Sequence, residues 1–176
     1  MPKRKTPSGA ELANLVTDAR QKSLALLEGL SDEQLIGPPI SIVNPLLWEI
    51  GHLAWFEERW ILRHLHNEKP LLNQTDVLYD SMAVRHDTRW DLPLPSKQET
   101  LDYMKGVLDR VVKIICDQEN PSEDDLYFYQ MVGFHEYMHA EAFAYTRQTL
   151  EFPSPLDSSE VGILKIEEIG GGPWPG

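Results

Sequence analysis

Two histidines four residues apart, His135 and His139, have the residue type and spacing that could bind a metal ion. On an α-helix, residues four positions apart project from the same face, so both imidazoles could reach one ion. A third histidine, His52, lies in a separate apolar segment. Three neutral imidazole nitrogens can hold a divalent transition metal and leave coordination positions open for water or substrate. The sequence therefore predicts a three-histidine metal site, provided that the two segments pack side by side.

The surroundings of these histidines favour a metal site over the alternative of surface or packed histidines. Phe134 and Met138 flank the pair, so its helix face is not plainly solvated. An unpaired imidazole would be costly to bury in the apolar segment around His52. Glu136 gives the pair the His-Glu-x-x-His pattern of zinc peptidases, but those enzymes take a further ligand from downstream. Because the third histidine here lies upstream, peptidase chemistry is a poor fit.

Several other side chains near these motifs are weaker candidates. Glu49 and Glu141 flank the expected ligands and could each orient an imidazole by a hydrogen bond, with a solvated carboxylate as the alternative. Cys116, the single cysteine, follows two isoleucines and is expected in or near the core; it cannot form an internal disulfide, which fits a reducing compartment. The remaining histidines are expected to be surface residues and not ligands: His64, His66 and His86.

Four helical segments are expected to position the histidines, because their apolar residues recur at helical spacing. Asn44 should cap the second helix, with Pro45 in its first turn. Ser96 should cap the third helix in a capping box with Glu99, and Ser122 should cap the fourth. The expected helices cover residues 8–30, 46–66, 96 to the turn at 120–122, and 122–151.

The segments between and after these helices complete the predicted architecture. A break at Gly29 should precede a short helical turn over residues 31–34, and residues 67–95 have no steady period and are expected to form a long loop. Residues 161–166 are strand-like by their β-branched content. The prediction is an all-α, antiparallel four-helix bundle over residues 1–155, with a long loop between helices two and three and an extended, strand-like tail over residues 156–176.

Composition excludes several classes of function. The net charge of -12 repels phosphate backbones, so nucleic-acid binding is disfavoured. No apolar run approaches the roughly 20 residues that span a bilayer. No apolar signal segment follows the basic N-terminus, so the cytoplasm is the expected location.

The two histidine motifs together resemble the DinB-like metal-binding fold. They resemble most closely the N-terminal domain of the ergothioneine-type sulfoxide synthases and of relatives that make ovothiol or selenoneine. Residues 45–57 are similar to the family's proline followed by W-x-x-G-H-x-x-W-F-x-E, and residues 134–141 are similar to its H-E-x-x-H-x-E. Residues 78–81 and the loop through Arg89 resemble the segment after the family's second helix.

The resemblance implies a four-helix bundle in which His52, His135 and His139 hold a non-haem iron(II). In the family, that iron activates O2 to join a thiol sulfur to the imidazole carbon of a histidine betaine. Three histidines also suit zinc or nickel. The family binds its thiol substrate with arginines from the loop after the second helix, and Arg85 and Arg89 lie in the corresponding stretch.

One departure from the family leaves three interpretations open. Family enzymes carry a large C-terminal domain of the formylglycine-generating type, and the strand-like end of this chain resembles the opening of such a domain. The first interpretation is the metal-binding part of a sulfoxide synthase-like oxidoreductase, which needs that second domain to act on a small-molecule thiol and a histidine-derived substrate. The alternatives are a stand-alone DinB-type metal-dependent thiol S-transferase or isomerase, and a non-catalytic helical module that forms a homodimer.

Overall fold

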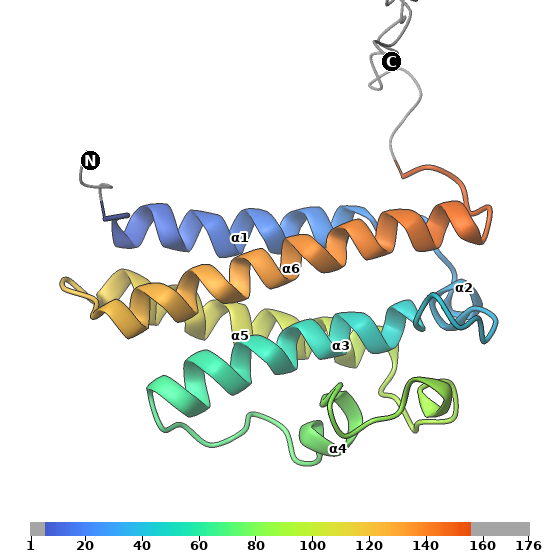
Figure 1. Ribbon diagram of the computed structural model, residues 1–176, viewed down its shortest axis with the longest axis horizontal. Helices are drawn as coiled ribbons and strands as arrows, with labels where there is room; N and C mark the ends of the chain where they lie inside the picture. The colour runs from blue at the N-terminus through green and yellow to red at the C-terminus, as the bar shows by residue number, and fades with distance from the viewer. Residues whose placement is uncertain (1–5, 156–176) are drawn as a thin grey trace, which may run out of the picture.

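Four long helices lie side by side in the computed structural model, which describes residues 6–155 (Figure 1). The long helices are α1 (Gly9–Ala25), α3 (Leu46–Glu57), α5 (Lys97–Asp117) and α6 (Glu123–Thr149), and α3 continues as the π-helix η1 (Glu58–Leu65). The short helices are α2 (Asp32–Ile36), α4 (Thr75–Tyr79) and the 3-10 helix η2 (His86–Thr88). The predicted all-α bundle is confirmed, whereas the predicted strand-like tail lies outside the described residues. Within residues 6–155, no helix is both long and apolar enough to cross a membrane.

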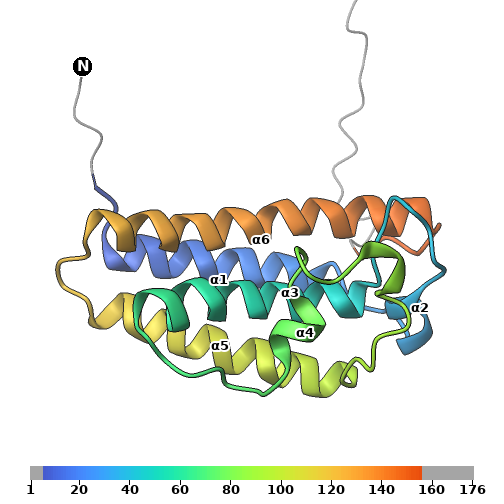
Figure 2. The ribbon, with the colours of Figure 1, turned by 60° about the horizontal axis from the view of Figure 1, so that its bottom comes forward.

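The four long helices form two pairs that run in opposite directions (Figure 2). Helices α1 and α6 run the same way and pack on each other, and α3 and α5 do so in the opposite direction. Because α3 and α5 are parallel neighbours, the chain must return along the bundle between them. Residues 66–96 make this return, and we call them the excursion. The expected loop is therefore present, and it carries the two short helices α4 and η2.

Local sequence explains where most of the helices begin. Ser96 and Glu99 form the predicted capping box of α5, and Ser122 forms one with Asp125 at the start of α6. The prediction that Asn44 caps the second helix is wrong. Pro45 occupies the capping position of α3 and makes no side-chain cap, because the amide of Asn44 bonds two other side chains, described below.

The first helix is shorter than predicted. It ends at Ala25 instead of near residue 30, because the chain turns through Leu26 to Gly29, which adopts a φ of 74°. Glycine tolerates this left-handed conformation without the clash that a Cβ would cause. The helical turn expected at residues 31–34 is present as α2, capped by Ser31.

The core lies between the four long helices, and α3 is its central element. Every residue of α3 except Phe56 is buried, as expected for a helix that is apolar on most sides. Val16, Val107 and Phe143 bring the other long helices to this core and are fully buried. Cys116 is exposed, so its expected place in the core is wrong. Its neighbour Ile115 takes the inward position, and the next residue of a helix points about 100° away.

A buried arginine joins all four long helices. Arg20 on α1 donates from Nε to Glu136 Oε1 at 2.6 Å and from Nη2 to Glu57 Oε2 at 3.0 Å. Its Nη1 donates to the backbone carbonyl of Met104 on α5 at 2.9 Å. Burial raises the pKa of Glu57 to about 7; the Arg20 cation opposes this rise, and the nearby Glu136 adds to it. This cluster was not predicted from the sequence, although Leu12, Val16 and Arg20 share one helical spacing.

Replacing Arg20 by methionine should destabilise the bundle strongly. The change leaves two buried carboxyl groups without their cation, and breaking a buried ion pair on one side costs about 3–5 kcal/mol. Urea unfolding monitored by circular dichroism measures this loss. Lys22→Met is the matched control, because Lys22 is exposed on the same helix, pairs with exposed Asp18 and lies over the ring of Tyr137; it should change stability by less than about 0.5 kcal/mol. Equal stability of the two variants would contradict the structural role of Arg20.

Candidate metal centre

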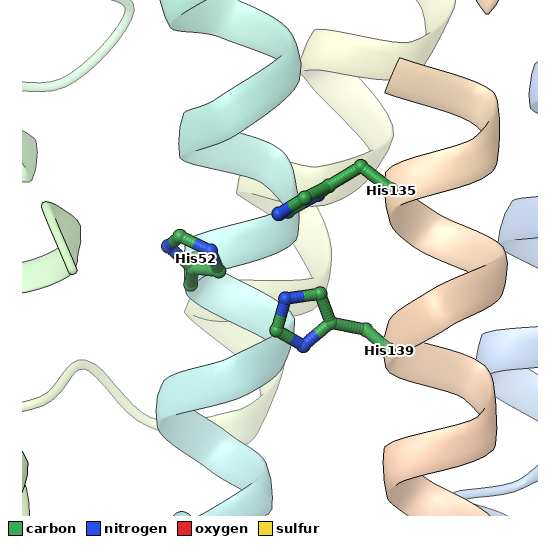
Figure 3. Close-up of side chains that lie close together, drawn as sticks. All are labelled: His52, His135 and His139. Atoms are coloured by element: carbon green, nitrogen blue, oxygen red, sulfur yellow. The ribbon is translucent and has the colours of Figure 1, made fainter. Parts of the chain in front are cut away.

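Three histidines from two helices converge on one point, as Figure 3 shows. His52 comes from α3, whereas His135 and His139 come from one face of α6. Each of the three offers a nitrogen, and these nitrogens all lie within 4.8 Å of one another. The convergence predicted from the sequence is therefore present. Three neutral nitrogen donors suit a divalent transition metal such as iron, zinc or nickel.

The orientation of His52 is fixed by the end of a short helix. Its Nδ1 lies 2.8 Å from the backbone carbonyl oxygen of Tyr79, the last residue of α4. A carbonyl can only accept, so Nδ1 carries the proton and Nε2 keeps its lone pair for a metal. The preceding carbonyl, that of Leu78, accepts from the indole Nε1 of Trp48 at 2.7 Å. Both bonds use carbonyls that a helix leaves without partners at its C-terminal end.

Burial keeps two of the three imidazoles neutral. It lowers the pKa of His52 from 6.5 to about 4, against the opposing effect of the bond to Tyr79. It also lowers the pKa of His135 to about 2, with further lowering by the neighbouring His139 and His52. A metal binds only the neutral imidazole. These two groups are therefore ready to bind at neutral pH without first losing a proton.

Aromatic rings from α3 line the site. The ring of Phe56 stacks on His135 with centroids 3.7 Å apart, and that of Trp48 stacks on His52 at 5.0 Å and 7°. Trp55 also stacks on His52, at 5.7 Å. Both tryptophans also belong to the hydrophobic core. These rings restrict the motion of the ligands and keep water from the side of the site that faces α3.

The two carboxylates proposed to orient the ligands lie in different places. Glu49 is buried at 2% exposure, and its Oε1 lies 3.7 Å from Nδ1 of His139. Within residues 6–155, Oε2 of Glu49 and Nδ1 of His139 are buried without a hydrogen-bond partner. The alternative of a solvated carboxylate is therefore wrong for Glu49. Glu141 is exposed and lines a hollow with Lys22 and Tyr137, so the structure does not bring it to the histidines.

The two arginines of the excursion also differ. Arg85 is exposed and forms an ion pair with Asp87 two residues later. Arg89 is buried at 9% exposure, donates to Asn44, and lies over the ring of Trp48. Their binding of a substrate stays a prediction, and only Arg85 has its side chain largely in solvent.

The other histidines take no part in the cluster. His64 packs on Trp60 and Phe128. His66 lies 3.3 Å from the hydroxyl of Tyr129, and His86 lies 2.7 Å from a backbone carbonyl. Each has a local partner, which agrees with the prediction that they are not ligands.

Comparisons with known proteins find relatives of this sequence. The sequence profile of the DinB superfamily matches residues 15–143. A hercynine oxygenase of Mycolicibacterium thermoresistibile is 31% identical over 137 residues, which are 77% of this chain and 30% of that protein. A hercynine oxygenase of Mycolicibacterium smegmatis is 28% identical over 149 residues, covering 84% of this chain and 34% of that protein. The chain thus spans about a third of the length of the curated relatives it matches.

Gly51→Ala should weaken metal binding by displacing the partner of His52. A Cβ on Gly51 would clash with the ring of Tyr79, so the ring must shift, and we expect the backbone of Tyr79, whose carbonyl holds His52, to shift with it. Loss of such an outer hydrogen bond typically costs 10–100-fold in metal affinity, which chelator competition with zinc(II) measures. Gly106→Ala is the control, because its nearest new contact is an ordinary 3.5 Å to Leu71. Equal zinc affinity in the two variants would show that Tyr79 does not hold His52.

In the metal-free protein, His52 should stay neutral until the pH falls to about 4. The unfolded imidazole takes up its proton near pH 6.5, whereas burial delays this in the folded protein. The contribution of His52 to stability is therefore fully present above about pH 6.5 and is lost as the pH falls from there to about 4. NMR titration of the imidazole Cε1–H signal measures the pKa directly. A midpoint near 6.5 would contradict a buried, neutral His52.

Proposed function

Because the chain belongs to the DinB superfamily, we propose that it is the three-histidine, non-haem iron domain of a sulfoxide synthase-like protein of ergothioneine-type biosynthesis. The observation that carries the proposal is the convergence of His52, His135 and His139, with all three ligand nitrogens within 4.8 Å. The similarity to proteins named hercynine oxygenase supports an oxygen-dependent reaction at this site. We expect the protein in the cytoplasm, as the sequence predicts.

The residues of this chain would hold the metal and shape its surroundings. The three histidines are neutral donors, so the charge of a bound divalent metal is left to be balanced by a substrate anion such as a thiolate. When bound, iron(II) would supply the activation of O2 for forming a bond between a thiol sulfur and an imidazole carbon. Phe56 and Trp48 hold the ligand rings in place by stacking. The exposed side chains of Phe134 and Met138 lie beside the ligands on α6, where substrate or a further part of the protein could cover the site.

The substrates proposed here are those of a longer protein that would contain this domain. We propose a small-molecule thiol and a histidine-derived partner, as the family resemblance implies and in keeping with the relatives' name, hercynine oxygenase. Arg85 is the better placed of the two arginines to meet the anionic groups of a thiol substrate, because its side chain is largely exposed. The matched relatives are about two and a half times as long as this chain, so further residues of such a protein could contribute to the pocket.

A self-contained enzyme is the second candidate. It is favoured by the fact that all three ligands, and the residues that orient them, lie within one bundle over residues 44–139. A stand-alone DinB-type thiol S-transferase or isomerase would use the metal to lower the pKa of a bound thiol or water. Turnover of a thiol by this chain alone, without O2, would favour the second candidate over the first.

The protein should bind about one metal ion per chain, and His135→Ala should abolish binding, since one third of the donor set is lost. Anaerobic titration with iron(II), followed by elemental analysis, measures the stoichiometry. His64→Ala is the matched control, because His64 is a histidine of the neighbouring helix that packs on aromatic rings. It should bind metal as the wild type does. Failure of the wild-type chain to bind iron(II) or zinc(II) would overturn both candidates.

A further inference from the structure

Arg89 is placed to act on the metal centre from outside it. It is 9% exposed, and its Nη1 donates to Asn44 Oδ1 at 2.6 Å while its Nη2 donates to the carbonyl of Val84 at 3.3 Å. Its guanidinium carbon lies 3.8 Å from the centre of the Trp48 ring. These contacts hold the Arg89 side chain in one place against the protein. Two further chains of contacts lead from it to two different metal ligands.

The first chain leads to His139. The Nδ2 of Asn44 donates to Glu49 Oε1 at 2.7 Å, and the same oxygen faces Nδ1 of His139 at 3.7 Å. The amide of Asn44 can serve Arg89 and Glu49 together in one orientation only, with its oxygen toward the guanidinium and its nitrogen toward the carboxylate. Metal-bound histidines almost always donate their second N–H to an acceptor, often a carboxylate. Glu49 is the buried carboxylate in position to accept from His139.

The second chain leads to His52. The indole of Trp48 contacts both the guanidinium of Arg89 and the imidazole of His52, whose ring is nearly parallel to it at 7°. A guanidinium over an indole face is attracted to the ring electrostatically, and more strongly when it is desolvated. The Trp48 Nε1 bond to Leu78 fixes the remaining rotation of the indole. Arg89 thus holds in place the flat surface against which His52 rests.

We propose that Arg89 is a positioning residue of the metal centre, which orients His139 through Asn44 and Glu49 and orients His52 through Trp48. The inference deepens the proposed function, on which it rests, because it requires that the three histidines bind a metal. It gives Arg89 a different role from the substrate binding that the family resemblance suggests. The third ligand, His135, is outside this network and rests on Phe56.

The test compares Arg89→Met with Arg85→Met. Both arginines belong to the excursion, but Arg85 is exposed and pairs with exposed Asp87, so its loss should leave zinc(II) affinity unchanged. Arg89→Met should weaken zinc(II) binding about 10–100-fold, measured by chelator competition on protein shown to be folded by circular dichroism. Arg89→Lys should not restore the affinity, because an ammonium lacks the planar fork and the stacking face of a guanidinium.

The spectrum of bound cobalt(II) separates positioning from a general loss of folded protein. At saturating cobalt(II), Arg89→Met should shift the visible absorption bands, because the ligand orientations change, whereas fewer folded molecules would only lower their intensity. Arg85→Met should reproduce the wild-type spectrum. A wild-type spectrum and affinity in Arg89→Met would overturn the inference.

Asn44→Leu tests the first chain without touching the stacking on Trp48. It should also weaken zinc(II) binding, and adding Arg89→Met to it should cost less than Arg89→Met alone, because the two residues act along one path. Fully additive effects would show that Arg89 does not act through Asn44.

If the wild-type chain binds neither zinc(II) nor cobalt(II), the proposed function fails and this inference fails with it. If the wild-type chain binds these metals and Arg89→Met binds them equally well, only the inference is overturned.

Discussion

The buried guanidinium of Arg20 sets the geometry on which the candidate metal centre depends. It bonds Glu57 on α3 and Glu136 on α6, the two helices that carry the histidines, while its third bond reaches α5. Glu136 directly follows His135, so the bond that ties α6 to the core also sets which way the adjacent imidazole points. A buried ion cluster adds little net stability over a well-packed apolar one, but it is satisfied in few arrangements. Arg20 therefore specifies one registration of α3 against α6, which is what three converging ligands require.

The same cluster engages the glutamate of the His-Glu-x-x-His pattern. In zinc peptidases that glutamate is the general base at the metal. Here one carboxylate oxygen of Glu136 accepts from Nε of Arg20 at 2.6 Å, and the residue is buried. Glu136 therefore belongs to the core cluster, which agrees with peptidase chemistry being a poor fit for this sequence.

The sequence predicted the parts of the fold and site that follow from local spacing. The capping serines, the apolar α3 and the pair His135 and His139 are properties of neighbouring residues, so periodicity finds them. Contacts between distant segments were not predictable in this way. Asn44 has the residue type of a helix cap, and only the fold reveals that Arg89 and Glu49 occupy its amide. Glutamate is likewise a residue type that is usually found at the surface, and Glu49 is buried because α3 is central.

The topology of the bundle explains why the outer partners of the site come from the excursion. Parallel neighbours such as α3 and α5 cannot be joined by a tight turn, so a long return segment is unavoidable. That segment must also satisfy its own backbone polar groups. It forms α4, whose last carbonyls have no partners within the helix, and these accept from Trp48 and His52. Gly51 lets Tyr79 approach α3 closely enough for this exchange. The connection that the helix order imposes thus supplies the acceptors that orient a ligand of the candidate centre.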